Sequence, residues 1–286
     1  MIFSNDSKIL SAVLKGNTDK VIALLNKGAD PDTLGSRDRT PLMSAAEDGH
    51  LAIVKALLNG RANPDVKNNE GYTALMFAAQ KGNAPVLELL LKGGADINAK
   101  SKAGHSALMF ATVWAARMAS IGKMETEQKV ALLIAAGADV NAADRRGRTA
   151  LMAAVRSGGG TLDEKNRLAI LNILLESGAN ADTQSDKGRT ALMSTAFRGL
   201  KDSFQALINA GANYNLRDSD GHTALMDAAM GCFWSYRKPG YITIIRSLLD
   251  MEVDISLKDN QGQTALMIAQ RHGRADIIAL LRKAGG

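Results

Sequence analysis

The stretch TALM at residues 149–152 decides the fold of this chain, because it returns throughout the sequence. Counting the near-copies TPLM and SALM, it occurs seven times, beginning at Thr40, Thr73, Ser106, Thr149, Thr190, Thr223 and Thr264. Successive copies start 33, 33, 43, 41, 33 and 41 residues apart, so a unit of 33 residues recurs and is lengthened in three places. A fixed period of this size indicates a repeat protein.

Each TALM is predicted to begin a short helix. Its threonine is a favoured N-cap residue, because the hydroxyl accepts a hydrogen bond from a free backbone N–H, and Ala or Pro41 follows at the first helical position. Before it, Asp144 and Gly147 show the signature of a tight turn, which is predicted to project as a finger. A second helix with a V/I-x-x-L-L core follows and stops at Gly-Ala-Asp or Gly-Ala-Asn, where the glycine supplies a left-handed conformation.

Eight such units fill the sequence as one predicted domain, residues 1–286. The first unit, residues 1–34, lacks TALM but keeps helical patterns at 8–14 and 18–26, so we expect it to be an N-terminal cap. The last unit, residues 259–286, is expected to be a C-terminal cap. The internal units are predicted at 35–67, 68–100, 101–143, 144–184, 185–217 and 218–258.

This order of turn, helix, short turn, helix and Gly-Ala-Asp at a period of 33 is the pattern of ankyrin repeats, and the chain resembles that family over nearly its whole length. The matching motifs are Thr-Pro-Leu at 40–42, Gly-His-Leu at 49–51, Ala-Ala-x-x-Gly at 78–82 and Gly-Ala-Asp-Val-Asn at 137–141. The resemblance implies an all-α ankyrin-repeat solenoid of about eight helix-turn-helix units with short β-hairpin-like fingers. The repeated TALM is similar to bacterial-type arrays.

One departure from the family is systematic. Where the family commonly has His after Thr-Pro-Leu, this chain has Met43, Met76, Met109, Met152, Met193, Met226 and Met267. The family histidine usually ties adjacent repeats by hydrogen bonding, so the resemblance implies that apolar packing replaces that tie here. One methionine per repeat at a buried helix start predicts core packing, not a copper site.

The composition sets limits on the class of protein. A hydrophobic content of 46% with only 4% aromatic residues fits an aliphatic core of stacked small helices. The single Cys232 excludes an intramolecular disulfide framework and a multi-cysteine metal site. No signal sequence or stretch of about 20 apolar residues is present, so we expect no membrane insertion and a cytoplasmic protein. A secreted or periplasmic location stays open if a leader has been removed.

The three lengthened units are predicted to place their extra residues between their two helices, on the edge opposite the fingers. The insertion at 113–123 is expected to extend a first helix, and the one at 157–166 to lengthen a second helix by about two turns. The third insertion, 231–240, is a loop rich in aromatic and basic residues. Candidates for partner contact, or for covering exposed helix flanks, are Trp114, Phe233, Trp234, Tyr236 and Arg237.

The sequence contains no catalytic, metal or cofactor constellation. The four histidines are far apart in sequence, and stacked layers roughly 10 Å apart cannot bring them onto one ion. The glycine run at 158–160 lacks the Lys-Ser/Thr ending of a phosphate loop. We therefore expect neither an enzyme nor a bound cofactor.

Function is expected at positions that differ between otherwise similar units, which are the finger tips and the exposed end of the first helix. In ankyrin arrays these positions line the concave face. The fifth and sixth units concentrate Arg145, Arg146, Arg148, Arg156, Lys187, Arg189 and Arg198 against Asp144 and Asp186. The remaining finger candidates are Arg37, Arg39, Tyr72, His105 and His222. This basic group either attracts an acidic partner or is a merely solvated face.

Two functions remain open from the sequence. The first is a non-enzymatic protein–protein interaction module that binds a partner, which could carry an acidic surface, through finger tips, concave helix face and edge insertions. The alternative is a sensor of an anionic or nucleotide-like small ligand, held by the central Arg and Lys beside aromatic rings. Nucleic acid is disfavoured, because the basic patch is compact and has only Phe197 nearby as a stacking ring. We expect a monomer.

Overall fold

The computed structural model describes residues 5–115, 123–156, 164–231 and 240–285. The chain forms two compact units, unit 1 (Met1–Arg145) and unit 2 (Arg146–Gly286). The described residues contain sixteen α-helices, one short 3-10 helix and no strand. The predicted all-α repeat architecture is therefore confirmed, with eight helix pairs.

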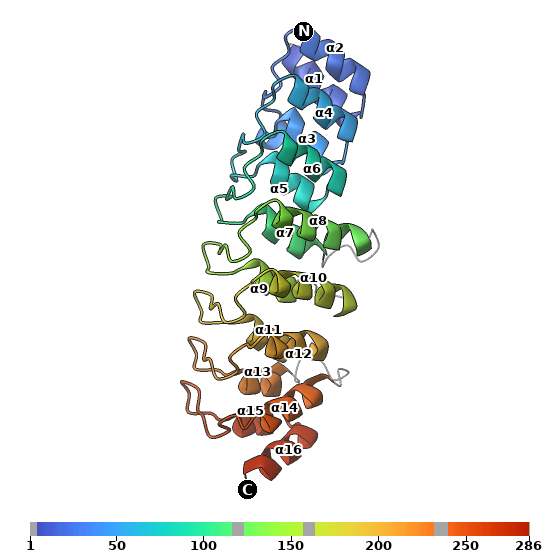
Figure 1. Ribbon diagram of the computed structural model, residues 1–286. Coiled ribbons are helices and arrows are strands. Elements are labelled where there is room, and N and C mark those ends of the chain that lie inside the picture. Colours follow the sequence, from blue (N-terminus) through green and yellow to red (C-terminus); the bar gives the residue numbers. More distant parts are fainter. Residues whose placement is uncertain (1–4, 116–122, 157–163, 232–239, 286) are drawn as a thin grey trace. The chain divides into compact units, whose positions relative to one another are not determined.

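Unit 1 contains four helix pairs: α1 (Asn5–Leu14) with α2 (Thr18–Asn26), α3 (Pro41–Glu47) with α4 (Leu51–Asn59), α5 (Ala74–Gln80) with α6 (Ala84–Lys92), and α7 (Ala107–Ala115) with α8 (Lys123–Ala135). The 3-10 helix η1 (Ser36–Asp38) lies in the first finger. The first helices α1, α3, α5 and α7 stack on one another, and the second helices α2, α4, α6 and α8 form a parallel row. The loops of the fingers lie to the left of their helices in Figure 1.

Unit 2 repeats this arrangement with α9 (Ala150–Arg156) and α10 (Glu164–Glu176), α11 (Ala191–Arg198) and α12 (Lys201–Asn209), α13 (Ala224–Gly231) and α14 (Gly240–Asp250), and α15 (Ala265–Arg271) and α16 (Ala275–Gly285). Helix α11 packs between α9 and α13, and α12 between α10 and α14. Each layer therefore presents a finger and a first helix on one side and a second helix on the other.

The predicted N-caps are confirmed at six of the seven TALM positions. The side-chain oxygens of Thr40, Ser106, Thr149, Thr190, Thr223 and Thr264 accept a hydrogen bond from the methionine N–H three residues later, at 3.2 to 3.5 Å. Thr73 is the exception, because its hydroxyl is buried and has no hydrogen-bond partner in the described part of the chain.

The methionine stripe is part of the core, as predicted, except at its last member. Met43, Met76, Met109, Met152, Met193 and Met226 are at most 4% exposed, whereas Met267 is 48% exposed. The prediction that Met267 packs in the core is therefore wrong. Its helix α15 packs against α13 and α16.

The fingers are tight turns that hydrogen-bond to one another. In the sixth repeat, Gly188 N–H donates to Ser185 O at 2.8 Å, and Ser185 N–H donates to Arg189 O at 3.0 Å. In the next finger, Ser219 N–H donates a hydrogen bond to Lys187 O of this finger at 2.9 Å. Gly188 has a φ of +67°, and a Cβ there would lie 2.9 Å from the Cα of Asp218. Glycine is required at this turn for both reasons.

Further polar ties join the loops after the second helices. In unit 1, Asn63 N–H donates to Asp32 Oδ1 at 3.0 Å, and in unit 2, Asn213 N–H donates to Asp182 Oδ1 at 2.7 Å. The left-handed glycine predicted before these loops is present at Gly28, Gly94, Gly137, Gly178 and Gly211, with φ between 79° and 91°. The equivalent positions after α4 and α14 are Arg61 and Glu252, whose φ values of 65° and 55° are also positive.

The insertions fall between the paired helices, as predicted. Helices α8 and α10 have 13 described residues, whereas α4, α6 and α12 have nine. Helix α7 has nine described residues where α5 has seven. Both α7 and α10 border residues that the structure does not describe, so the predicted helix extensions stay predictions. Residues 116–122, 157–163 and 232–239 lie outside the described structure.

Candidate functional site

In unit 1, Tyr72 and His105, which directly precede two of the TALM copies, each meet the residue four positions after the first residue of that copy, Phe77 and Phe110. Tyr72 lies edge-on to Phe77 and Phe110, with ring centroids 5.8 and 5.1 Å apart, and His105 lies edge-on to Phe110 at 5.6 Å. Such edge-to-face pairs contribute about 0.5–1.5 kcal/mol each beyond their burial. Phe77 is buried, while the other three rings are half-buried. The layers of α5 and α7 therefore share one aromatic cluster beside their fingers.

A group of three charged residues, Arg39, Glu47 and Lys81, adjoins this cluster. The guanidinium of Arg39 stacks over Phe77 at 4.3 Å from the ring centroid and also pairs with Glu47, which Lys81 Nζ approaches at 2.8 Å. Burial opposes the charge on Glu47, but the hydrogen bond from Lys81 and the charge of Arg39 outweigh it and lower the Glu47 pKa. Arg39 is thus oriented by both a ring and a carboxylate.

In unit 2, the matching position carries a buried ionic network. Arg189 Nη1 lies 2.9 Å from Asp227 Oδ1 and 3.1 Å from Asp218 Oδ2. His222 Nε2 lies 3.4 Å from Asp259 Oδ2, and its Nδ1 lies 4.0 Å from Asp218 Oδ2. The three carboxylates are at most 3% exposed, so water screens these interactions weakly.

The aspartate that opens a finger divides its two oxygens between two repeats. Asp218 Oδ1 accepts from the backbone N–H groups of Asp220 and His222 in its own finger, at 3.0 and 2.8 Å. Its Oδ2 accepts from Arg189 of the preceding finger. In unit 1, Asp144 Oδ2 likewise lies 3.4 Å from His105 Nε2 of the preceding finger. A basic residue at the end of one finger is therefore held by the first residue of the next.

Burial and charge act against each other at Asp227. Burial raises its pKa to about 6, and the charge and hydrogen bond of Arg189 limit the rise. For Arg189, burial favours loss of its proton, but Asp227 and Asp218 outweigh it, and the guanidinium pKa is raised. The charge of Arg189 is therefore neutralised by two aspartates within the fold.

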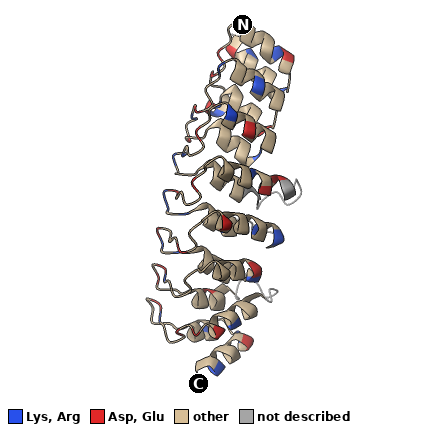
Figure 2. Cartoon of the chain, in the orientation of Figure 1, with Lys and Arg blue, Asp and Glu red and all other residues tan. Residues whose placement is uncertain are grey.

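The remaining predicted residues differ in how open they are to solvent. Arg37, Arg145, Arg146, Arg156 and Lys187 are exposed, with Arg145 ending unit 1 and the last three in unit 2. Arg148 and Arg198 are half-buried, and Arg198 Nη1 donates to Arg156 O at 2.9 Å. Figure 2 marks both basic and acidic residues on the finger loops of each unit.

The predicted insertion residues are not tested. Trp114 belongs to α7, but its side chain lies outside the described part of the structure. Phe233, Trp234, Tyr236 and Arg237 also fall outside the described residues.

Several residues of this surface were not predicted from the sequence. Phe77, Phe110 and Asp227 occupy the same place in their repeats, four residues after Thr73, Ser106 and Thr223. One turn into a helix, that position returns to the face of the N-cap, next to the finger. The sequence signal was available, because this position carries Ser, Phe, Phe, Ala, Ser, Asp and Ile in the seven copies, while the residue before it is always Met and the residue after it is Ala in six of the seven.

Within the described residues, no group of three or more His, Cys, Asp or Glu could hold a metal ion. No helix in that part of the chain is both long and apolar enough to cross a membrane.

Comparison with known proteins agrees with this architecture. The family model described as ankyrin repeats (3 copies) matches residues 9–101, 54–121 and 161–238. Among solved structures, the chain is similar to the ankyrin repeat domain of Bcl-3, described as a unique member of the IkappaB protein family. The two share 30% sequence identity with a TM-score of 0.65, over 83% of this chain and 97% of that one. No curated protein matches the sequence significantly.

Proposed function

The chain belongs to the ankyrin-repeat family, and from this premise we propose that it is a non-enzymatic module that binds another protein through its finger tips and first helices. Ankyrin repeats are generally protein–protein interaction modules. The repeats are folded before the partner arrives, so binding orders few backbone segments and loses little conformational entropy.

The observation that carries this proposal is the placement of the variable residues. The threonine, leucine and methionine of TALM cap and pack the stack, whereas the residue before TALM and the fourth residue after its threonine vary and gather on one side of each unit. In unit 1 these positions form a half-exposed aromatic surface at Tyr72, His105 and Phe110. Aromatic anchors bordered by charge are typical of binding surfaces in which few residues dominate the affinity.

The exposed cations support a partner with an acidic surface. Arg145, Arg156 and Lys187 are exposed on fingers or at the end of α9, whereas Arg189 is neutralised by Asp218 and Asp227. Exposed charges of one sign raise the association rate with an oppositely charged partner more than they raise the final affinity. Salt should therefore slow association without greatly changing dissociation.

The experiment begins with capture of partners from a lysate of the source cells, followed by binding kinetics with the purified partner. The test variant carries Arg145→Glu, Arg156→Glu and Lys187→Glu. A control with the same change of net charge carries Lys20→Glu, Lys55→Glu and Arg246→Glu, at exposed positions of α2, α4 and α14. We expect association to slow about tenfold in the test variant and less than about twofold in the control.

Three outcomes bear on the proposal. Equal slowing in both variants would show that the basic fingers are not the contact surface. Loss of binding on Tyr72→Ala, with folding intact, would place the contact on the aromatic surface of unit 1. A nucleotide or small anion that raises the melting temperature, in the absence of any captured protein, would favour the ligand-sensor alternative instead.

A further inference from the structure

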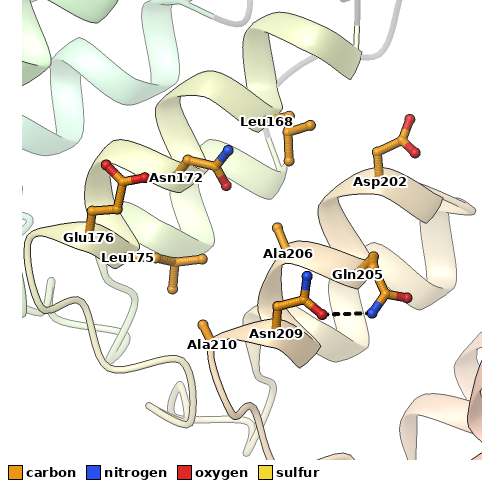
Figure 3. Close-up of a pocket in the computed structure, with 9 residues that line it drawn as sticks. All are labelled: Leu168, Asn172, Leu175, Glu176, Asp202, Gln205, Ala206, Asn209 and Ala210. Carbon is orange, nitrogen blue, oxygen red and sulfur yellow. Dashed lines mark hydrogen bonds between the residues drawn. The ribbon is translucent and has the colours of Figure 1, made fainter.

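A groove opens on the outer side of unit 2, between the second helices α10 and α12 (Figure 3). Its volume is about 600 Å³. One wall consists of α10 residues from Leu168 to Glu176, and the other of α12 residues from Asp202 to the cap residue Ala210. On each helix the lining residues follow helical spacing, so the groove runs along both helices for about 12 Å.

The α12 wall of the groove includes two small residues, Ala206 and Ala210. Ala206 is the sixth residue of α12, and the sixth residue of the equally long α6 in unit 1 is Leu89. Ala210 follows at the end of the same wall and is exposed. Opposite them, Leu168 and Leu175 point from α10 into the groove and are only half-buried. The floor is therefore apolar and accessible.

The rim is polar but not basic. Asn172 lies on α10, and Gln205 and Asn209 lie on α12, where Gln205 Nε2 donates to Asn209 Oδ1 at 2.8 Å. Among the described residues, the charged side chains that line the groove are Glu176 and Asp202, both acidic and exposed. Asp202 Oδ1 lies 3.9 Å from Lys201 Nζ on its own helix.

The two acidic residues lie at opposite ends of the groove, and the mouth beside Glu176 is the more negative of the two. Glu176 is the last residue of α10, and Asn209 is the last residue of α12, so both helices end there. The last carbonyl groups of each helix carry partial negative charge, and the Glu176 carboxylate adds to it. A cation is the favoured ligand for this mouth, although the whole chain carries a net charge of +6.

The walls also limit the shape of an occupant. The backbone groups of α10 and α12 are hydrogen-bonded within their helices, so an extended peptide would find no strand edge to pair with. A helix satisfies its own backbone and can lay an apolar stripe along the leucine and alanine side chains. Packing of a third helix into the groove between two others follows ordinary ridge-and-groove geometry.

We propose that the groove between α10 and α12 docks an amphipathic helix of a partner protein, with its apolar stripe on Leu168, Leu175 and Ala206 and a lysine or arginine beside Glu176. This surface lies on the second helices, away from the fingers, so it is separate from the protein-binding surface proposed above. The two surfaces are tested by different variants.

The test uses the full chain and a fluorescent helical peptide of about 14 residues, four turns long, with leucine along one face and lysine elsewhere. A matched peptide replaces every lysine by glutamate. We expect the lysine peptide to bind at least about tenfold more tightly than the glutamate peptide, measured by fluorescence anisotropy. Because the chain is positively charged overall, non-specific attraction would give the opposite preference.

Two variants locate the binding. Ala206→Leu fills the groove and should weaken the lysine peptide at least about tenfold. The matched control, Ala56→Leu, makes the same change at the sixth residue of α4 in unit 1 and should leave binding within about twofold. Circular dichroism and thermal unfolding check that both variants fold.

Glu176→Gln keeps the shape of an exposed side chain, and it decides the result if Ala206→Leu does not fold. It should weaken the lysine peptide several-fold and leave the glutamate peptide unchanged or slightly tighter. Equal binding of the two peptides, full binding by Ala206→Leu, no effect of Glu176→Gln, or no saturable binding of the lysine peptide would each overturn the proposal.

Discussion

The guanidinium of Arg189 lies 2.9 Å from the buried carboxylate of Asp227, which joins the finger of the sixth repeat to the first helix of the seventh. A half-buried arginine held by a buried aspartate is part of the interface between two repeats. Removing one partner of such a pair leaves a buried charge uncompensated, which costs about 3–5 kcal/mol. Arg189 therefore contributes more to the stability of unit 2 than to the positive charge of its surface.

The raised pKa of Asp227 predicts how stability depends on pH. Its folded-state pKa of about 6 lies above the ordinary value of 3.8, so between these values the folded protein holds a proton that the unfolded chain has released. This group therefore adds stability as the pH falls through 6 towards 4, and that contribution is lost as the pH rises. A shift of about two pKa units corresponds to roughly 3 kcal/mol.

The measurement is the free energy of unfolding between pH 4 and 7 for the wild type and for Asp227→Asn, which keeps the shape but cannot titrate. The difference between the two should move in favour of the wild type as the pH is lowered. The neighbours Arg189, Asp218 and His222 are present in both proteins, which differ only at the carboxyl of Asp227. Parallel curves would show that Asp227 does not change its protonation in this range.

The exceptional cap at Thr73 predicts a pair of opposite mutational effects. The Thr190 hydroxyl accepts from Met193 N–H at 3.2 Å, so Thr190→Val should cost about 1 kcal/mol. The Thr73 hydroxyl is buried without a partner among the described residues, so Thr73→Val should be neutral or stabilising by up to about 1 kcal/mol. Urea denaturation of both variants checks this. A loss of similar size at both positions would contradict it.

The fold could be predicted from the sequence because the same local signals recur in phase. Thr190, the buried Met193 and the left-handed Gly211 each follow from a local rule of capping, packing or backbone conformation, and each recurs in other repeats. Length changes were harder to place. An insertion can extend either helix of a pair, and the described α8 is four residues longer than α4 and α6.

The contacts of the candidate surface residues could be predicted only in part, because these contacts join neighbouring repeats. His105, Arg189 and His222 were predicted as surface contacts, yet each is held by the aspartate that opens the following finger. Comparison of each repeat with the next would have shown that Asp144, Asp218 and Asp259 follow these three residues, whereas Asn68, Ser101 and Ser185 follow Arg39, Tyr72 and Arg148. The pairing depends on stacking, which the sequence of one repeat does not contain.

The two helix ends that lack glycine predict stabilising substitutions. Arg61 and Glu252 are exposed residues with φ values of 65° and 55°, a conformation that costs non-glycine residues about 1 kcal/mol. Arg61→Gly and Glu252→Gly should each raise the free energy of unfolding by about 0.5–1 kcal/mol. Gly211→Ala is the reverse control, because φ is 83° and no atom lies within 4 Å of the added Cβ. It should destabilise the fold by a similar amount, and no change in any of the three would refute the assignment of strain.

The last two methionines of the stripe predict different costs for the same truncation. Met226 is 1% exposed between stacked first helices, so Met226→Ala leaves a cavity and should cost about 2–5 kcal/mol. Met267 is 48% exposed, so Met267→Ala removes little buried surface and should cost less than about 1 kcal/mol. Thermal and urea unfolding of both variants measures the difference. If Met267→Ala cost as much as Met226→Ala, the end of α15 would have to be covered in the native protein, by a second copy of the chain or by a partner. Repeating the unfolding at two protein concentrations would then separate these cases, because only self-association makes the melting temperature of the purified chain depend on its concentration.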